Sequence, residues 1–318
     1  MIRFIMALAF LLTCLGVAYS CPGPPCQRAV LDFDGDNKTD YAVVRFVGAS
    51  YTWYLQRSSA GFLAQAWGDS TDTFVPGDYD NDGKWDIAVW RPGSPSIFYI
   101  LKSSNGTLLT FPFGQTGDEP RITQDFDGDH IADPAVARNV SGVFTWYIQR
   151  STLGFTFVSF GNANTDFPIR GDFDGDGKAD VAVYRATSPG TFYVLRSSDG
   201  GVQAATFGNQ FTDYILPADF DGDGKTDYAV WRGRTNGTPG TWYWLQSSDG
   251  GFRALNFGTG FLDKPVPGDY DGDGKADQAV WRFGTPANFY VNGSLTGFAN
   301  LVFGQTSDQQ PAFTLQAR

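Results

Sequence analysis

Four short apolar segments recur in each stretch of about 47 residues, and turn-forming residues separate them. The first segment ends in Arg, as in residues 228–232, and the second carries an aromatic–Tyr pair. The third ends in an aromatic residue and Gly, and the fourth, such as residues 215–220, leads into an Asp-rich loop. No segment shows the 3.6-residue period of a helix, so the pattern predicts an all-β protein of six similar four-stranded units.

A unit of four strands and this length matches the blade of a β-propeller. A single blade cannot bury both faces, whereas blades stacked around an axis cover one another. We therefore expect residues 28–318 to form one propeller of six blades. A seventh copy of the loop-leading segment, residues 311–316, has no loop after it, and we expect it to close the ring or cap an edge. A distorted seven-bladed ring is the alternative.

The Asp-rich loop has the pattern Asp-x-Asp-Gly-Asp-Gly-Lys-x-Asp, and its copies begin 46 to 50 residues apart. Carboxylates fall at positions 1, 3, 5 and 9, and position 7 can offer its backbone carbonyl. Calcium takes about six to eight hard oxygen ligands, whereas magnesium requires a more rigid octahedron. Gly at positions 4 and 6 permits the positive φ that such a loop needs. The loops therefore predict up to six Ca²⁺ ions.

The predicted ligands are the same five positions of every loop, with position 7 acting through its carbonyl. They are Asp32, Asp34, Asp36, Lys38 and Asp40; Asp78, Asp80, Asp82, Lys84 and Asp86; Asp125, Asp127, Asp129, Ile131 and Asp133; Asp172, Asp174, Asp176, Lys178 and Asp180; Asp219, Asp221, Asp223, Lys225 and Asp227; Asp269, Asp271, Asp273, Lys275 and Asp277.

The six copies differ in quality. The last three match the pattern completely, whereas Asn81 replaces Gly at position 4 of the second loop and Asn37 replaces Gly at position 6 of the first. The third loop has His130 at position 6, followed by Ile131. His and Asn adopt left-handed backbone geometry more often than most residues do. We therefore interpret His130 as a loop residue, not a catalytic one, and expect the third loop to be the weakest site.

The loop, the Ala-Val-aromatic-Arg strand and the recurrent Phe-Gly together resemble FG-GAP-like (VCBS) repeats, over roughly residues 30–303. This resemblance implies a propeller with calcium in the loop between the first two strands of a blade. The family includes integrin α-subunit headpieces, fungal propeller lectins and propellers of some polysaccharide lyases. Membership therefore implies an architecture, and it leaves the function open.

The first 20 residues have the features of a secretory signal: Arg3, an apolar stretch over residues 4–17 and a small-x-small site at residues 18–20. The apolar stretch is shorter than the ~20 residues of a membrane span. We therefore expect a protein without a membrane span that is secreted, periplasmic or held at the cell surface.

A short Cys/Pro-rich segment, residues 21–27, follows the signal. Cys21 and Cys26 form an even pair in an exported chain, which suggests a disulfide. Lipid attachment at Cys21 is the alternative. Five Asn-x-Ser/Thr sequons, at Asn37, Asn105, Asn139, Asn236 and Asn292, matter only in a cell that glycosylates them.

The charge balance narrows the possible partners. The net charge is −11, and the six loops hold 24 of the 34 acidic residues. This acidity argues against a nucleic-acid partner, which requires a basic face. His130 is the only histidine, and this argues against a zinc site and against His-based catalysis.

Residues that repeat in every unit are expected to be structural. We expect the strand-ending arginines to pair with carboxylates or to stack on aromatic rings. We expect Trp90, Trp231 and Trp281 to pack between blades. The Asp that follows each aromatic–Gly pair is likewise expected to be structural, because a catalytic site normally breaks the symmetry of a repeat. These residues are Asp72, Asp118, Asp166, Asp213, Asp263 and Asp308.

We therefore predict a monomeric, non-catalytic module that binds glycans or protein surfaces. Six similar units can provide multivalent sites, and exposed aromatic residues can stack on sugars. The sequence shows no nucleophile motif and no acid/base pair outside the loops, and we expect no enzymatic activity. The alternatives are the propeller of a polysaccharide lyase or hydrolase, which needs such a pair, and a structural cell-surface protein.

Overall fold

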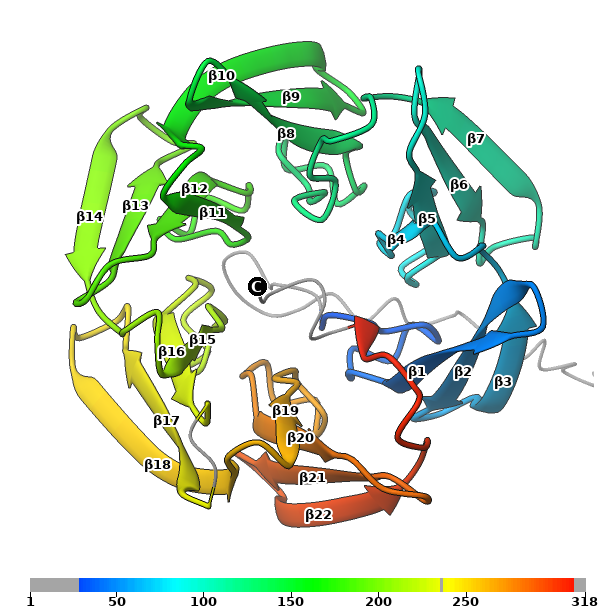
Figure 1. Ribbon diagram of the computed structural model, residues 1–318, viewed down its shortest axis with the longest axis vertical. Helices are drawn as coiled ribbons and strands as arrows, with labels where there is room; N and C mark the ends of the chain where they lie inside the picture. The colour runs from blue at the N-terminus through cyan, green and yellow to red at the C-terminus, as the bar shows by residue number, and fades with distance from the viewer. Residues whose placement is uncertain (1–28, 235–236, 312–318) are drawn as a thin grey trace, which may run out of the picture.

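The computed structural model describes residues 29–234 and 237–311 as one ring of six β-sheets around a central axis (Figure 1). The fold is an all-β, six-bladed propeller, as the repeat predicts, and the seven-bladed alternative is wrong. The signal segment, Cys21, Cys26 and residues 312–316 lie outside the described residues.

Each sheet is antiparallel and takes its strands in sequence order. The strands, grouped by blade, are β1 (Tyr41–Val47), β2 (Ser50–Arg57) and β3 (Gly61–Ala66); β4 (Thr73–Phe74), β5 (Ile87–Arg91), β6 (Ile97–Leu101) and β7 (Leu108–Pro112); β8 (Ala135–Val140), β9 (Val143–Arg150) and β10 (Gly154–Asn162); β11 (Asp166–Ile169), β12 (Val181–Arg185), β13 (Thr191–Leu195) and β14 (Val202–Thr206); β15 (Asp213–Ile215), β16 (Tyr228–Arg232), β17 (Pro239–Leu245) and β18 (Phe252–Thr259); β19 (Asp263–Pro265), β20 (Gln278–Arg282), β21 (Asn288–Gly293) and β22 (Gly297–Val302).

Blades 1 and 3 have three-stranded sheets in which an isolated bridge replaces the innermost strand. In blade 3 the bridge joins Glu119 to Ala137. Seven positions separate Asp118 from the first loop residue in blade 3, whereas six separate the equivalent residues of blades 2, 4, 5 and 6, so blade 3 has one extra residue in its inner segment.

The innermost strands lie upstream of where the apolar pattern places them. In blade 5 the strand is β15, Asp213–Ile215, and not residues 215–220. The Leu216 N–H still donates to the Ala229 carbonyl in the next strand, and the Ala218 carbonyl accepts from the N–H of Asp227 at the end of the loop, but Pro217 between them cannot donate a hydrogen bond. The predicted segment is therefore the exit of the strand and the approach to the loop.

The ring closes through Asp308 and Gln309. Val44 and Gln309 exchange two backbone hydrogen bonds of 2.9 and 2.8 Å, which adds Gln309 to the inner edge of β1. The Arg45 guanidinium binds the Asp308 carboxylate at 2.6 and 2.9 Å. The contacts that close the ring therefore come from residues just before the predicted segment 311–316. Asp308 is the Asp that follows the last aromatic–Gly pair, and this Asp, not the apolar segment after it, keeps the same place in every blade.

The core lies between the blades. One apolar cluster joins blades 6, 1 and 2 and includes Trp281, Trp53 and Phe74. Trp90, Trp231 and Trp281 are buried, and their indole N–H groups donate to the carbonyls of Phe113, Phe257 and Phe303. These three tryptophans are packing residues, as predicted.

The repeated arginines and link aspartates form one structural unit in every blade. Each guanidinium binds the buried link Asp and lies over the Tyr of the aromatic–Tyr pair, so both predicted contacts are present. The units are Arg45–Asp308–Tyr54, Arg91–Asp72–Tyr99, Arg138–Asp118–Tyr147, Arg185–Asp166–Tyr193, Arg232–Asp213–Tyr243 and Arg282–Asp263–Tyr290.

Candidate metal centres

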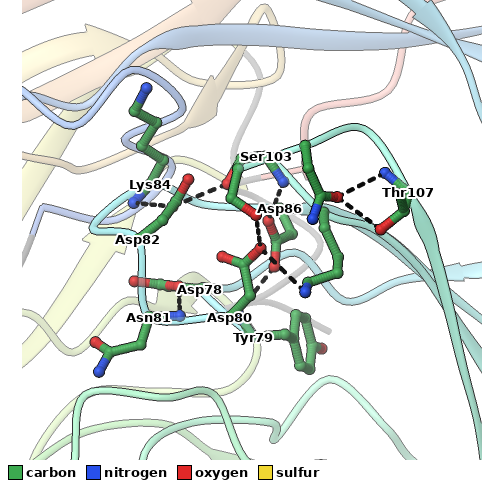
Figure 2. A network of polar contacts seen from close by, with 12 residues as sticks. Asp78, Tyr79, Asp80, Asn81, Asp82, Lys84, Asp86, Ser103 and Thr107 are labelled. Atoms are coloured by element: carbon green, nitrogen blue, oxygen red, sulfur yellow. Dashed lines mark hydrogen bonds and ion pairs between the residues drawn. The ribbon is translucent and has the colours of Figure 1, made fainter.

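In the four blades with a complete sheet, the Asp-rich loop connects the first and second strands, as between β4 and β5. The second loop illustrates its internal geometry (Figure 2). The Asp78 carboxylate accepts hydrogen bonds from the backbone N–H groups of Asn81 and Gly83 at 2.7 and 3.0 Å. Asp86 accepts one from Tyr79 N–H at 2.9 Å. The first and last carboxylates therefore hold the loop in a tight turn.

Positive φ angles at positions 4 and 6 make this turn possible. Gly fills most of these positions, and the replacements Asn37, Asn81 and His130 have φ of 63°, 59° and 69°. His130 is therefore a left-handed loop residue, as predicted. Its backbone N–H donates to Asp125 at 2.7 Å, as Gly donates in the complete loops.

The carboxylates of each loop converge. In the second to fifth loops, one oxygen from each of positions 1, 3 and 9 lies within 4.8 Å of the others, and in the first loop positions 1, 3 and 5 do so; a sixth such group is present. The named groups are Asp32, Asp34 and Asp36; Asp78, Asp80 and Asp86; Asp125, Asp127 and Asp133; Asp172, Asp174 and Asp180; Asp219, Asp221 and Asp227. The metal-binding role of every predicted ligand, including position 5 and the position 7 carbonyls, stays a prediction.

Position 3 supplies the observation that tests these groups as cation sites. Asp34, Asp80, Asp127 and Asp271 each keep one buried carboxylate oxygen without a hydrogen-bond partner among the described residues. A buried, unpaired carboxylate oxygen is costly unless a cation or donor satisfies it. The other oxygen of Asp34 accepts from Ser59 and Ala60, so the unpaired one is fixed in direction. The donor set, which is oxygen only, fits calcium.

The pKa values of the loop carboxyls also favour cation binding. Burial raises the pKa of the position 9 carboxyls to about 7 in Asp40, Asp133 and Asp227 and to about 6 in Asp86, Asp180 and Asp277. Without a cation, these carboxyls therefore keep their protons to a higher pH than ordinary aspartates do. At Asp34 burial also disfavours the charge, but the hydrogen bonds from Ala60 and Ser59 outweigh it and lower the pKa.

The turn between the last two strands of each blade, which the sequence pattern did not connect with the loops, binds them directly. Ser103 donates its N–H to Asp86 at 2.6 Å and its hydroxyl to Asp82 at 2.9 Å, and the Ser104 hydroxyl binds Asp80 (Figure 2). Equivalent pairs are Ser58–Ser59, Ser151–Thr152, Ser197–Ser198 and Ser247–Ser248, and Ser294 with Thr296 acts in the sixth. The Ser that recurs 17 to 20 residues after the last Asp of each loop was the signal available in the sequence.

Backbone hydrogen bonds also join the six loops into a closed ring. In each case the N–H of position 8 donates to the carbonyl of position 1 in the preceding loop, at 2.5 to 2.7 Å. Thr39 completes the ring by donating to Asp269. The conformation of each loop is therefore coupled to that of its neighbours.

Side chains pack across the same junction. The Lys at position 7 lies over the Gly at position 4 of the preceding loop, and a Cβ on Gly175 would lie 2.7 Å from Lys225 Cγ. The second loop has Asn81 at position 4, and the third loop has Ile131 at position 7. The single loop with a side chain at position 4 is therefore followed by the single loop without Lys at position 7.

This pairing predicts the outcome of a double-mutant cycle. Gly175→Asn should lower the free energy of unfolding by about 1–3 kcal/mol, because the new side chain overpacks against Lys225. Lys225→Ile should change it little, and the double variant should recover part of the loss. Urea unfolding in excess calcium measures all three variants. Strictly additive effects would show that the two positions do not interact.

Comparisons with known proteins agree with this architecture. A profile described as FG-GAP-like repeat matches residues 172–230 and 219–280, which contain the fourth, fifth and sixth loops. Residues 172–280 of the propeller therefore match FG-GAP-like repeats. These are the loops that follow the pattern completely, and the structure repeats their geometry in the other blades.

Two solved structures match the chain at low sequence identity, and the first of them shares the propeller fold. A triple arginine-to-alanine mutant of AofleA from Arthrobotrys oligospora is 10% identical, with 80% of each chain covered and a TM-score of 0.51. A complex of BBS1N with ARL6DN soaked with lead is 12% identical, with 88% of this chain and 82% of that chain covered and a TM-score of 0.44. A search of curated proteins found no match. Within the described residues, no helix is long and apolar enough to cross a membrane.

Proposed function

We propose that this propeller is an exported, calcium-stabilised module that binds glycans or protein surfaces without catalysing a reaction. The observation that carries the calcium part is the set of buried, unpaired oxygens on Asp34, Asp80, Asp127 and Asp271. In each loop the carboxylates at positions 1, 3 and 9 would hold the ion, with position 5 and the position 7 carbonyl as further ligands. The bound ion would supply positive charge to a cluster of carboxylates that otherwise repel one another.

The loops suit a structural role better than a ligand site. Their carboxylates already bind the turn of the same blade, and their backbones bind the next loop. Six divalent ions would carry twelve positive charges into a chain of net charge −11. The ligand-binding surface is then to be sought in residues that the loops and the Arg–Asp–Tyr units do not use.

Exposed aromatic residues support the binding part of the proposal. Phe62, Phe155, Phe252 and Phe298 occupy equivalent places in the outermost strands β3, β10, β18 and β22, and each is more than half exposed. Each also contacts the Tyr of its own blade, which fixes the ring. Repeated aromatic faces on a rigid scaffold are suited to stacking on sugars or to apolar protein contacts.

A glycan array probed with and without calcium tests this proposal. We expect specific hits that need calcium, because chelation loosens the scaffold that positions the binding residues. A blank array would contradict the glycan part and move the proposal to protein adhesion or structure. Turnover of an acidic polysaccharide would overturn the non-catalytic part.

A further inference from the structure

The six-fold repeat breaks on one side of the central channel. Two residues before the loops stand Val30, Pro76, Thr123, Arg170, Pro217 and Pro267, so blade 4 alone has a charge there. Of the residues just before the loops, only Gln124 carries an amide, and Trp85 is the only aromatic residue at loop position 8. Residues that hold the fold are expected to repeat in every blade. Arg170, Gln124 and Trp85 do not repeat, so they need another explanation.

The three residues come together in space. Arg170, Gln124 and Trp85 line one cavity of about 210 Å³, and Arg170 and Gln124 also line an adjoining cavity of about 150 Å³. They come from the loop ends of blades 2, 3 and 4, whose inner segments face the middle of the ring (Figure 1). The departures therefore mark a single place in the fold.

Arg170 is a cation that has no anionic partner among the described residues. Its guanidinium lies 5.9 Å from the centre of the Trp85 ring and makes no ion pair or hydrogen bond within residues 29–234 and 237–311. Burial lowers its pKa to about 10, which still leaves it charged at neutral pH. The repeated strand-ending arginines differ, because each of them binds a buried Asp.

Five aspartates border the two cavities, and calcium bound in the loops would offset their negative charge. The bordering aspartates are position 1 residues turned toward their own loops; Asp172, for example, accepts from the N–H groups of Gly175 and Gly177. Lys178 and Lys275 add positive charge to the lining. The other charged pair that breaks the repeat, Glu119 and Arg121, is satisfied by a bond of 2.6 Å between its own groups.

Gln124 is held in place for recognition. Its side-chain oxygen accepts from Gly171 N–H at 2.8 Å, and its amide nitrogen makes a 3.3 Å bond to the Ile122 carbonyl. An amide nitrogen has two hydrogens, so one is available to a ligand. A guanidinium, a fixed amide donor and an indole ring thus border one space.

We propose that this channel site binds an acidic sugar. The Arg170 guanidinium would bind the sugar carboxylate, Gln124 would donate to a ring or hydroxyl oxygen, and Trp85 would contact the pyranose face. This inference rests on the proposed glycan-binding function and assigns one binding site and one ligand class to it.

Isothermal titration of the calcium-loaded protein with D-glucuronate tests the proposal, with D-glucose and inorganic phosphate as comparison ligands. We expect glucuronate to bind at least about tenfold more tightly than glucose, because the charged hydrogen bond is lost with glucose. Arg170→Gln should remove this preference, and Trp85→Leu should weaken both sugars. Arg253→Gln, which removes an exposed arginine on β18, should change nothing.

Three results would overturn the proposal. The first is the absence of glucuronate binding to the unchanged protein, and the second is equal binding by Arg170→Gln. The third is phosphate binding as tight as glucuronate binding, which would indicate an oxyanion site without sugar recognition. If Arg170→Gln does not fold, Arg170→Lys, which keeps the charge, takes its place in the titration. If glucuronate does not bind in the titration but the array gives hits for neutral glycans, the proposed glycan-binding function holds and the acidic-sugar site is contradicted.

Discussion

Removal of calcium by EDTA at pH 7.5 is expected to lower the melting temperature by more than about 10 °C. Each site filled at 100 times its Kd adds about 2.7 kcal/mol to folded-state stability, and ~1 kcal/mol corresponds to roughly 2–4 °C for domains of 150–250 residues. Several filled sites therefore give a shift of this size. Differential scanning fluorimetry with and without calcium measures it, and an equal concentration of magnesium is the matched control. An unchanged melting temperature would contradict the calcium assignment.

The pH dependence provides a second check on the same groups. The pKa of Asp40 rises from 3.8 to about 7 in the metal-free fold, and that of Asp86 to about 6, because burial disfavours their charge. A carboxyl with a raised folded-state pKa contributes stability that is present below pH 4 and is lost as pH rises toward 7. In EDTA the protein should therefore melt at a lower temperature at pH 7.5 than at pH 5.

Calcium should reverse this trend, because the ion favours the ionised carboxylates. The same melting experiment in excess calcium should give a higher melting temperature at pH 7.5 than at pH 5. The opposite slopes distinguish direct ligation by these carboxyls from a general effect of salt. Parallel slopes in calcium and EDTA would show that the position 9 carboxyls do not take part.

Arg45→Ala is expected to reduce the free energy of unfolding by about 3–5 kcal/mol, because it leaves the Asp308 carboxylate buried without its cation. The Asp308 side chain is 0% exposed, and its remaining hydrogen bond comes from Gln305 N–H at 2.8 Å. This pair is also the one that joins the two ends of the ring, 263 residues apart. Urea unfolding in excess calcium measures the loss.

Two variants make the Arg45 experiment specific. Arg196→Ala breaks an exposed pair with Asp199 on the rim and should produce no measurable change. Arg185→Ala breaks the equivalent buried pair inside blade 4 and should match Arg45→Ala in free energy. A loss in Arg45→Ala no larger than in Arg196→Ala would show that the closing pair does not stabilise the ring.

The sequence by itself determined the blade and its loop. Six Asp-rich loops at nearly constant spacing, each followed by Ala-Val-x-Arg, fix the strand after the loop, as the agreement of residues 228–232 with β16 shows. They also determine the turn, because Asp, Gly and Asn have local conformational preferences that act within nine residues. Local repetition is information that a sequence carries directly.

Tertiary structure decided what passes between units. The bond from Thr39 to Asp269, the serines that hold the loop carboxylates and the closure by Asp308 and Gln309 all join segments that lie apart in sequence. The innermost strands were misplaced because their hydrogen bonds, not their apolar residues, define them. Arg170, Gln124 and Trp85 look unrelated along the chain, because residues that deviate from a repeat share no pattern until the ring brings them together.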